Sequence, residues 1–258
     1  MLRFRSLGSG SSGNATVVEA GRGSKVTRLL IDCGFGLKHL DARLGAAGLT
    51  ASQLDAVFIT HEHGDHIGCV RQLALRERIP IWMSRGTHAA LGASDLDGLF
   101  HTASDGQAID LGGLQLMPFT VPHDAREPLQ LTCSDGESRL GVLTDLGHAT
   151  THVLAHLGQC QALLLECNHD PDLLAASSYP AFLKNRVGGL HGHLANADAA
   201  AIARAVQHPG LQRVVAAHLS KQNNRPALAR TALAEALGKG AVAIDIADAQ
   251  HGTAWFEV

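Results

Sequence analysis

The sequence predicts an α/β protein in which mixed β-sheets are covered by helices. Short apolar segments rich in strand-favouring residues outnumber the segments with helical spacing, and they come as meanders with occasional helical crossovers. The 258 residues, 45% hydrophobic and 17% charged, are enough to bury a proper core. We find no Pro-rich linker, charge run or readable internal repeat. A single domain over residues 1–258 is therefore expected.

The first half of the chain is predicted to form strands joined by turns, with one helix. Strands are expected at residues 3–7, 16–20, 26–32, 54–60 and 79–84. The segment GSGSSGN (8–14) reads as a polar loop, and GRGS (21–24) as a turn between two strands. Residues 67–78 have helical spacing, and this helix should end before Pro80.

The second half is predicted to continue the sheets and to add longer helices. Further strands are expected at 114–121, 129–133, 139–145, 161–167, 211–218, 241–247 and 253–258, and helices at 150–158, 196–208 and 225–237. We expect Asn196 to act as the N-cap of the second of these helices. Pro226 suits the first turn of the third.

Composition limits the function. The formal net charge of −3 gives no global basic field, so nucleic-acid binding would need a local basic patch or bound cations. The five cysteines are scattered and form no CxxC pair, which favours reduced thiols in a cytosol over a disulfide framework. The N-terminus lacks the apolar core of a signal peptide, and no stretch could span a bilayer. A cytoplasmic location without a membrane partner is expected.

The motif HEHGDH follows an apolar strand directly. On an extended strand end, His61 and His63 can point the same way, whereas Asp65 and His66 follow at a turn and can aim at a neighbouring point. Imidazole and carboxylate groups together suit zinc, manganese or iron. A polar N-cap with surface histidines is the alternative, but four ligand-type residues share one short motif. Two metals are therefore predicted, with Glu62 facing away.

Two sites need more ligands than this motif offers. His123, Asp145 and His218 each come directly after an apolar run, where loops on a rigid sheet carry function. Any one of them alone would be read as a capped turn or a satisfied core histidine. Their recurrence after the motif favours metal ligation.

The order Asp32, HEHGDH, His123, Asp145 and His218 resembles the five-motif order of the metallo-β-lactamase fold superfamily, over nearly the whole chain. The resemblance implies an αββα sandwich of two mixed β-sheets flanked by helices, with two divalent metal ions, zinc first and manganese or iron as alternatives. On that mapping one metal is held by His61, His63 and His123, the other by Asp65, His66 and His218, and Asp145 bridges the two. Asp32 would orient a ligand or its loop.

Finer features resemble one branch of the superfamily. Position 145 is Asp rather than the Cys of zinc β-lactamases, and the segments 6–19, 163–170, 179–196 and 216–224 resemble the YycJ/WalJ-like branch, related to RNase Z, RNase J and PhnP. This implies 5′→3′ exonuclease hydrolysis of a phosphodiester, in DNA rather than RNA. The alternatives are a small-molecule hydrolase of the same fold, acting on a cyclic phosphodiester, thioester or lactone, and a closed metal-binding module without catalysis. The oligomeric state is left open, a dimer included.

The expected chemistry assigns roles to two residues. Two cations about 3.5–4 Å apart can hold a hydroxide between them and neutralise a phosphoryl oxygen. Asp65 could take the proton from the bridging water. His193 resembles the Gly-His element of RNase Z-like enzymes, and we assign it to phosphate contact or to protonation of the leaving oxygen. A structural histidine beside a helix is the alternative for His193, and the expected reading of His191.

A local basic rim would allow a mildly acidic protein to hold nucleic acid. The candidate substrate-binding residues, for which solvated surface side chains are the alternative, are Asn168, His169, Lys184, Arg186, Asn223 and Asn224, with Lys221 and Arg225 beside the last two. Glu166 could support ligands from behind. The loop 8–14 is either a plain turn or a phosphate contact near the metals.

Overall fold

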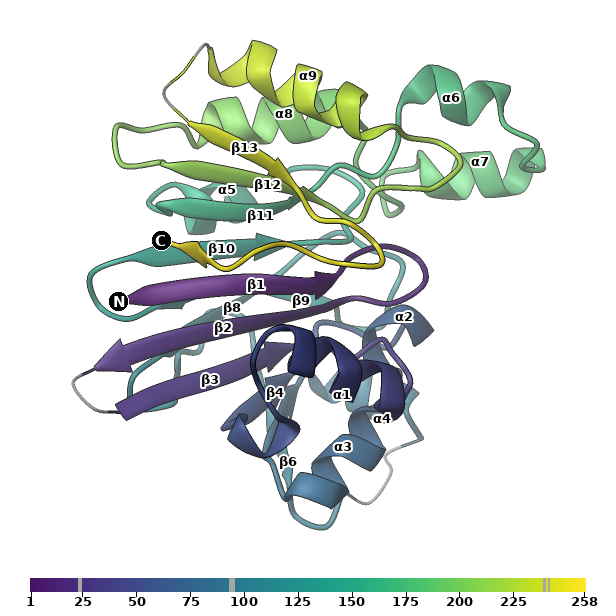
Figure 1. Ribbon diagram of the computed structural model, residues 1–258. Coiled ribbons are helices and arrows are strands. Elements are labelled where there is room, and N and C mark those ends of the chain that lie inside the picture. Colours follow the sequence, from purple (N-terminus) through teal and green to yellow (C-terminus); the bar gives the residue numbers. More distant parts are fainter. Residues whose placement is uncertain (23–24, 93–95, 239, 241) are drawn as a thin grey trace.

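The computed structural model describes residues 1–22, 25–92, 96–238, 240 and 242–258, and these form two mixed β-sheets of seven strands each. Helices α8 and α9 lie on one side of the molecule and α1 and α3 on the opposite side (Figure 1). Buried side chains from both sheets meet in a central core. The predicted αββα sandwich is confirmed.

The first sheet is built mainly from the N-terminal half. In spatial order it contains β14 (Phe256–Glu257), β1 (Leu2–Gly8), β2 (Ala15–Arg22), β3 (Lys25–Ile31), β4 (Ala56–Phe58), β5 (Ile81–Met83) and β6 (Phe100–Thr102). The pairs from β14 to β3 are antiparallel, and those from β3 to β6 are parallel.

The second sheet has the same design. In spatial order it contains β7 (Ile109–Asp110), β8 (Gln115–Thr120), β9 (Leu129–Ser134), β10 (Arg139–Leu143), β11 (Ala162–Glu166), β12 (Arg213–Ala217) and β13 (Ala243–Ile246). The pairs from β7 to β10 are antiparallel and those from β10 to β13 parallel. The two sheets therefore repeat one topology. This repeat is not readable in the sequence because core positions exchange apolar residues freely.

The helices connect and cover the parallel strands. The first half contains α1 (Leu37–Ala46), the 3₁₀-helix η1 (Ala51–Gln53), α2 (Gly64–Ile67), α3 (Val70–Glu77) and α4 (Arg85–Ala90). The second half contains α5 (Thr151–Leu157), α6 (Pro171–Ala176), α7 (Ala181–Val187), α8 (Asn196–Ala205) and α9 (Pro226–Leu237). Helices α1, α4, α6 and α7 and strands β6 and β7 were not predicted.

Alternating side chains of the inner strands fill two different cores. In β4, Ala56 and Phe58 face the second sheet, whereas Val57 packs on the outer face with Leu40 and Leu73 of the covering helices. A third core lies between the second sheet and α5, α8 and α9. Strands buried on both faces read as continuous apolar runs, which is why they could be located from the sequence.

Two local predictions need correction, and two others fall partly on residues that the structure does not describe. The helix expected over 67–78 is broken into α2 and α3, because Gly68 adopts a φ of +25°. The position requires glycine, since a Cβ there would overlap the carbonyl oxygen of Cys33. The N-cap of α8 is Ala195 rather than Asn196, whose amide pairs with that of Asn224 instead. The turn predicted at 21–24 includes residues 23 and 24, and the strand predicted at 241–247 includes residue 241, all outside the described residues.

The five cysteines are buried and free. Among the described residues, none of the helices is long and apolar enough to cross a membrane.

Candidate metal centre

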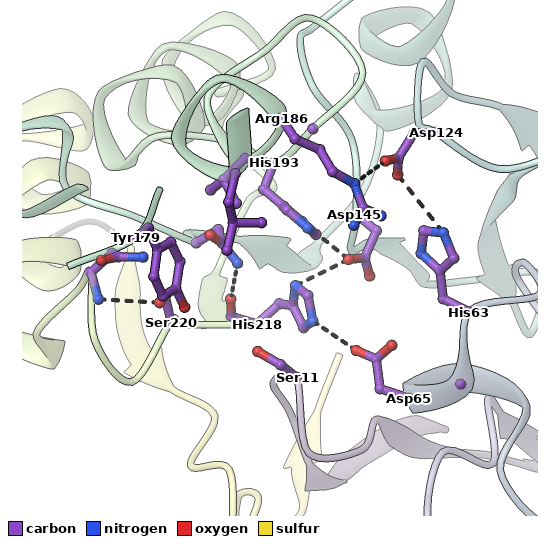
Figure 2. Close-up of a pocket in the computed structure, with 16 residues that line it drawn as sticks. Ser11, His63, Asp65, Asp124, Asp145, Tyr179, Arg186, His193, His218 and Ser220 are labelled. Atoms are coloured by element: carbon purple, nitrogen blue, oxygen red, sulfur yellow. Dashed lines mark hydrogen bonds and ion pairs between the residues drawn. The ribbon is translucent and has the colours of Figure 1, made fainter. Parts of the chain in front are cut away.

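The candidate ligands converge in the loops that follow strands of both sheets. His61, His63, Asp65 and His66 follow β4, while His123, Asp145 and His218 follow β8, β10 and β12. Four of them, His63, Asp65, Asp145 and His218, line a cavity of about 350 Å³ (Figure 2). The carboxyl ends of strands in both sheets, three of them with parallel neighbours, therefore supply one polar site.

A first candidate set consists of His61, His63 and His123. The Nδ1 atom of His63 lies 3.1 Å from Nε2 of His61 and 3.3 Å from Nε2 of His123. Ligands at about 2.0–2.1 Å from a tetrahedral zinc ion would lie roughly 3.3 Å apart. Burial lowers the pKa of both His61 and His123, so these rings are neutral and offer lone pairs. The set suits one divalent ion.

A second candidate set consists of Asp65, His66 and His218. The Oδ2 atom of Asp65 lies 3.4 Å from Nε2 of His218 and 3.7 Å from Nε2 of His66. Burial alone would lower the pKa of both imidazoles, but nearby carboxylates, Asp145 above all, outweigh it: the pKa of His66 rises well above its usual value and that of His218 to about 9. Without metal, protons occupy the place that a cation would take.

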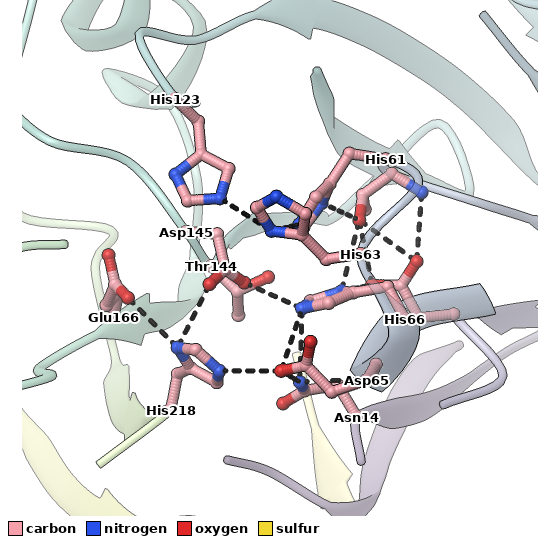
Figure 3. A network of polar contacts seen from close by, with 12 residues as sticks. Asn14, His61, His63, Asp65, His66, His123, Thr144, Asp145, Glu166 and His218 are labelled. Atoms are coloured by element: carbon pink, nitrogen blue, oxygen red, sulfur yellow. Dashed lines mark hydrogen bonds and ion pairs between the residues drawn. The ribbon is translucent and has the colours of Figure 1, made fainter. Parts of the chain in front are cut away.

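Asp145 lies between the two sets (Figure 3). Its Oδ2 is 3.0 Å from Nε2 of His66, and its Oδ1 is 3.1 Å from Nδ1 of His218. Although burial opposes ionisation, the cationic His218 and His66 hold the pKa of this carboxyl well below its usual value. Its Oδ2 is buried and, apart from the ion pair with His66, forms no hydrogen bond among the described residues. A buried anionic oxygen left in this way fits a metal ligand.

Carboxylates behind the rings orient two of the candidate ligands. Asp32 accepts hydrogen bonds from the amide and hydroxyl of Thr60, and its Oδ2 lies 2.7 Å from Nδ1 of His66. Glu166 lies 3.0 Å from Nδ1 of His218 and accepts from two backbone amides. Both rings thereby keep Nε2 directed at the site, as in metal centres whose histidines are held by a second carboxylate.

The backbone is unusual at three of these positions. Asp32, Asp145 and His218 have φ values of 60°, 63° and 54°. Residues without glycine's freedom adopt this left-handed region at a cost, and they cluster at functional sites where the surroundings hold them. Each follows a strand, so the strain turns its side chain toward the site.

The loop 8–14 lies against the second candidate set, which answers the question left open by the sequence. The amide nitrogen of the Asn14 side chain lies 3.3 Å from Oδ2 of Asp65 and 3.1 Å from Nε2 of His66. Ser9 accepts a hydrogen bond from the amide of His218, and Ser11 lines the cavity. Asn14 was not predicted. Its only signal in the sequence is a polar residue directly before a strand.

The structure brings some of the predicted substrate residues to the cavity. His193, Asn168, Arg186 and Asn223 line it. Nδ1 of His193 lies 2.8 Å from Glu166, whose carboxylate raises the pKa of the imidazole well above its usual value against the effect of burial. Asn223 is buried, and both polar atoms of its amide have no partner among the described residues.

Other predicted residues lie elsewhere. Lys184 and His169 line a neighbouring cavity of about 560 Å³. Of the described residues, His193 alone lines both this cavity and the first one. The side-chain amide nitrogen of Asn224 donates hydrogen bonds to the carbonyl oxygen of Cys167 and to the side-chain oxygen of Asn196. Lys221 and Arg225 line a third cavity. Sequence reasoning missed Tyr179, Ser220 and Asp124 in the first cavity. Asp124 pairs with Arg186, so this arginine is not a free cation.

Comparison with known proteins agrees with this arrangement. The family model described as "Beta-lactamase superfamily domain" matches residues 27–219. The chain is 30% identical to exodeoxyribonuclease YycJ of Bacillus anthracis over 256 residues, covering 98% of this chain and 95% of that protein. It is 28% identical to exodeoxyribonuclease WalJ of Streptococcus pneumoniae over 250 residues, covering 95% and 91%.

Among solved structures, the metallo-β-lactamase fold protein YhfI from Bacillus subtilis superposes with a TM-score of 0.74 at 17% identity, covering 99% of this chain and 98% of that one. At this identity the likeness concerns the fold.

Proposed function

The chain belongs to the β-lactamase superfamily, in the branch of the YycJ and WalJ proteins, and from this premise we propose that it is an exonuclease that hydrolyses DNA phosphodiesters with two divalent metal ions. The observation that carries the proposal is the position of the Asp145 carboxylate between the two candidate sets. Its buried carboxylate is paired with His66 and His218 of the second set and has an oxygen within 4.8 Å of a ring nitrogen of His61 in the first set. Its Oδ2 forms no hydrogen bond in the described chain beyond the ion pair with His66. Such a residue joins two adjacent cation sites into one centre.

The candidate ligand set supports zinc first, with manganese or iron as alternatives. His61, His63 and His123 would hold one ion, Asp65, His66 and His218 the other, and Asp145 both. When bound, the ions supply Lewis-acid stabilisation of the phosphate and a nucleophile at neutral pH. They would also supply the positive charge that a chain with a formal net charge of −3 lacks.

The chain's own residues would handle the protons. Asp65 is partly exposed to the cavity and would accept the proton of the attacking water on a carboxylate oxygen. Glu166 holds Nδ1 of His193, which leaves Nε2 to donate a proton to the leaving oxygen. The pKa of this imidazole, raised well above its usual value, keeps that proton available near neutral pH.

Asn223 would bind the substrate directly. Burial of an amide without partners is unfavourable. A base edge entering the cavity could accept from the N–H donors and donate to the carbonyl oxygen, whereas a phosphate could only accept from the N–H donors. Arg186 stands at the same wall, where it can contact a backbone phosphate while it remains paired with Asp124.

DNA as substrate is supported by the names of the two relatives that match nearly the whole chain. A small phosphodiester is the second candidate, because a cavity of about 350 Å³ is closer in size to one nucleotide than to a long polymer. A thioester or lactone has less support, since the two relatives that match nearly the whole chain are both named exodeoxyribonucleases.

The test uses purified protein with zinc or manganese and end-labelled single- and double-stranded DNA, with bis(p-nitrophenyl) phosphate and a thioester in parallel. We expect metal-dependent release of mononucleotides, abolished by a chelator and nearly abolished in Asp145→Ala and His61→Ala. The control is His251→Ala, because His251 is exposed and does not line the cavity. Absence of metal-dependent nucleotide release would overturn the nuclease proposal, and hydrolysis of the small diester alone would favour the second candidate.

A further inference from the structure

A second cluster of possible metal ligands lies on the outer side of the second sheet, outside the candidate metal centre. Asp105, in the segment that joins β6 to β7, meets His152 and His156 of α5, and one ligand atom from each lies within 4.8 Å of the other two. None of the three residues lines the first cavity. The proposed function uses none of them, so their arrangement needs an explanation of its own.

The two histidines have the spacing of a metal-binding pair on a helix. His152 and His156 are four positions apart in α5, so both rings project from one face of the helix. Their ring centroids are 4.7 Å apart. Two histidines at this spacing, with a carboxylate from elsewhere in the chain, are a known zinc ligand set.

Neighbouring residues hold two of the three ligands in place. The ring of His156 is stacked on the buried Phe119, with centroids 4.7 Å apart and planes inclined by 14°. Oδ1 of Asp105 accepts a hydrogen bond from the amide of Thr120. A carboxylate has lone pairs on two oxygens, so Asp105 can bind a cation without breaking this bond. Ligands that are held before binding lose less conformational freedom when an ion arrives.

The ring nitrogens are available to a cation. Nε2 of His152 lies 2.9 Å from Oδ1 of Asp105, and the proton between them occupies a place that a metal ion could take. The ring nitrogens of His156 have no hydrogen-bond partner among the described residues. Burial and the neighbouring His152 lower the pKa of His156, which keeps this ring neutral. An exposed ion pair needs only His152 and Asp105, so it does not explain the third group.

We propose that Asp105, His152 and His156 form a further metal site, here called the α5 site, for a divalent transition-metal ion, zinc first. Imidazole and carboxylate ligands suit zinc better than magnesium or calcium, and three protein ligands leave one position to water. The chain crosses from the first sheet to the second between β6 and β7, and α5 packs on the second sheet. An ion in the α5 site would clamp this crossing to the helix. The proposal does not depend on the proposed function.

The test counts bound metal ions. The metal-free full chain is dialysed against buffers of increasing free zinc, and bound zinc is measured by atomic emission. His156→Phe keeps a ring that can stack on Phe119, and Asp105→Asn keeps an oxygen that can accept from the amide of Thr120. We expect each variant to bind one zinc ion fewer per chain than wild type. Equal zinc content of wild type and both variants would overturn the proposal.

Two controls separate the α5 site from other places that bind zinc. His251→Ala should bind as much zinc as wild type, because His251 forms a similar exposed pair with Asp248 for which the described chain offers no third ligand. The loss of one ion should persist when His156→Phe is combined with Asp145→Ala, which impairs the candidate metal centre. A loss that vanishes in this background would assign the ion to that centre and refute the α5 site.

Amide hydrogen exchange tests the clamp. In the Asp145→Ala chain, zinc should slow exchange in residues 103–108 and in α5, and adding His156→Phe should abolish this protection. At about a tenfold excess of free zinc over its Kd, zinc should raise the Tm of wild type by about 3–6 °C more than that of Asp105→Asn. Unchanged exchange in both segments at a zinc level that fills the site would show that the ion is not a clamp.

Discussion

The Oδ2 atom of Asp32 lies 2.7 Å from Nδ1 of His66, and this contact commits one side of the imidazole so that Nε2 faces Asp65 and Asp145. The carboxylate is itself held by the amide and hydroxyl of Thr60. A residue that precedes α1, η1 and β4 in the chain thus sets the direction of a candidate metal ligand that follows them.

Asp32→Ala should therefore weaken metal binding without removing any ligand. We expect the affinity of the second candidate set to fall by about 10- to 100-fold, the usual effect of losing a carboxylate behind a ligating histidine. Competition with a chelating dye measures it. Asp55→Ala, near the start of β4 and bonded to the Arg28 backbone, is the control. Equal affinities for the two variants would contradict the role given to Asp32.

Glu166→Gln should impair both metal binding and turnover. The amide keeps the shape of the side chain but removes the negative charge shared by His193 and His218. We expect kcat to fall by roughly 10- to 100-fold, the usual effect of losing a carboxylate behind a ligating histidine. The matched control is Glu235→Gln on the exposed side of α9. A variant with full metal content and wild-type kcat would show that the charge of Glu166 is dispensable.

The metal-free protein should lose stability as the pH rises. In the folded state the pKa of His218 is about 9, above its usual value of about 6.5. A group whose pKa is raised by folding stabilises the protein fully below the unfolded value, and this contribution is lost as the pH passes the folded value. The free energy of unfolding of chelated protein should thus decline between about pH 6.5 and pH 9.

Urea unfolding at several pH values, with and without zinc, measures this. Metal binding needs neutral imidazoles, so zinc should stabilise the protein more as the pH rises, opposite to the metal-free trend. A metal-free stability that increases over this range would contradict the protonated state assigned to His66 and His218.

Gly34→Ala should disrupt the centre through the backbone alone. A Cβ at Gly34 would overlap the carbonyl oxygen of Asp65, which also accepts a hydrogen bond from the amide of Asn14. We expect a loss of about 1–3 kcal/mol in the free energy of unfolding, typical of forced overpacking, together with reduced metal content. The control is Gly36→Ala two residues on, where a Cβ meets open space. Both are measured by thermal unfolding and metal analysis.

Much of the fold could be predicted because its strands are apolar on both faces and short turns separate them. Helix α7 was missed since it buries none of its residues, and α6, six residues long, was missed since it buries only Leu174. Neither helix therefore shows an amphipathic period in the sequence. Strands β6 and β7 have three and two residues, too few for a pattern. Their pairing is decided by neighbouring strands rather than by local preference.

The candidate ligands could be predicted because each follows an apolar run in the sequence, so that the pattern itself marks the strand end. Substrate residues could not be separated in this way. Asn223 and Asn224 are neighbours in the chain, yet the amide of the first lacks partners beside the cavity and that of the second ties α8 to the end of β11. Only the direction of each side chain distinguishes them, and direction depends on tertiary packing.

The ligands of each candidate set come from both sheets: His61 and His63 meet His123, and Asp65 and His66 meet His218. Neither half of the sandwich holds a complete set alone. During synthesis, the second set cannot close until the chain has been made as far as His218 and the sheets have docked. Metal uptake would thus be a late step in maturation, and a stably bound ion would report that the two halves have assembled correctly.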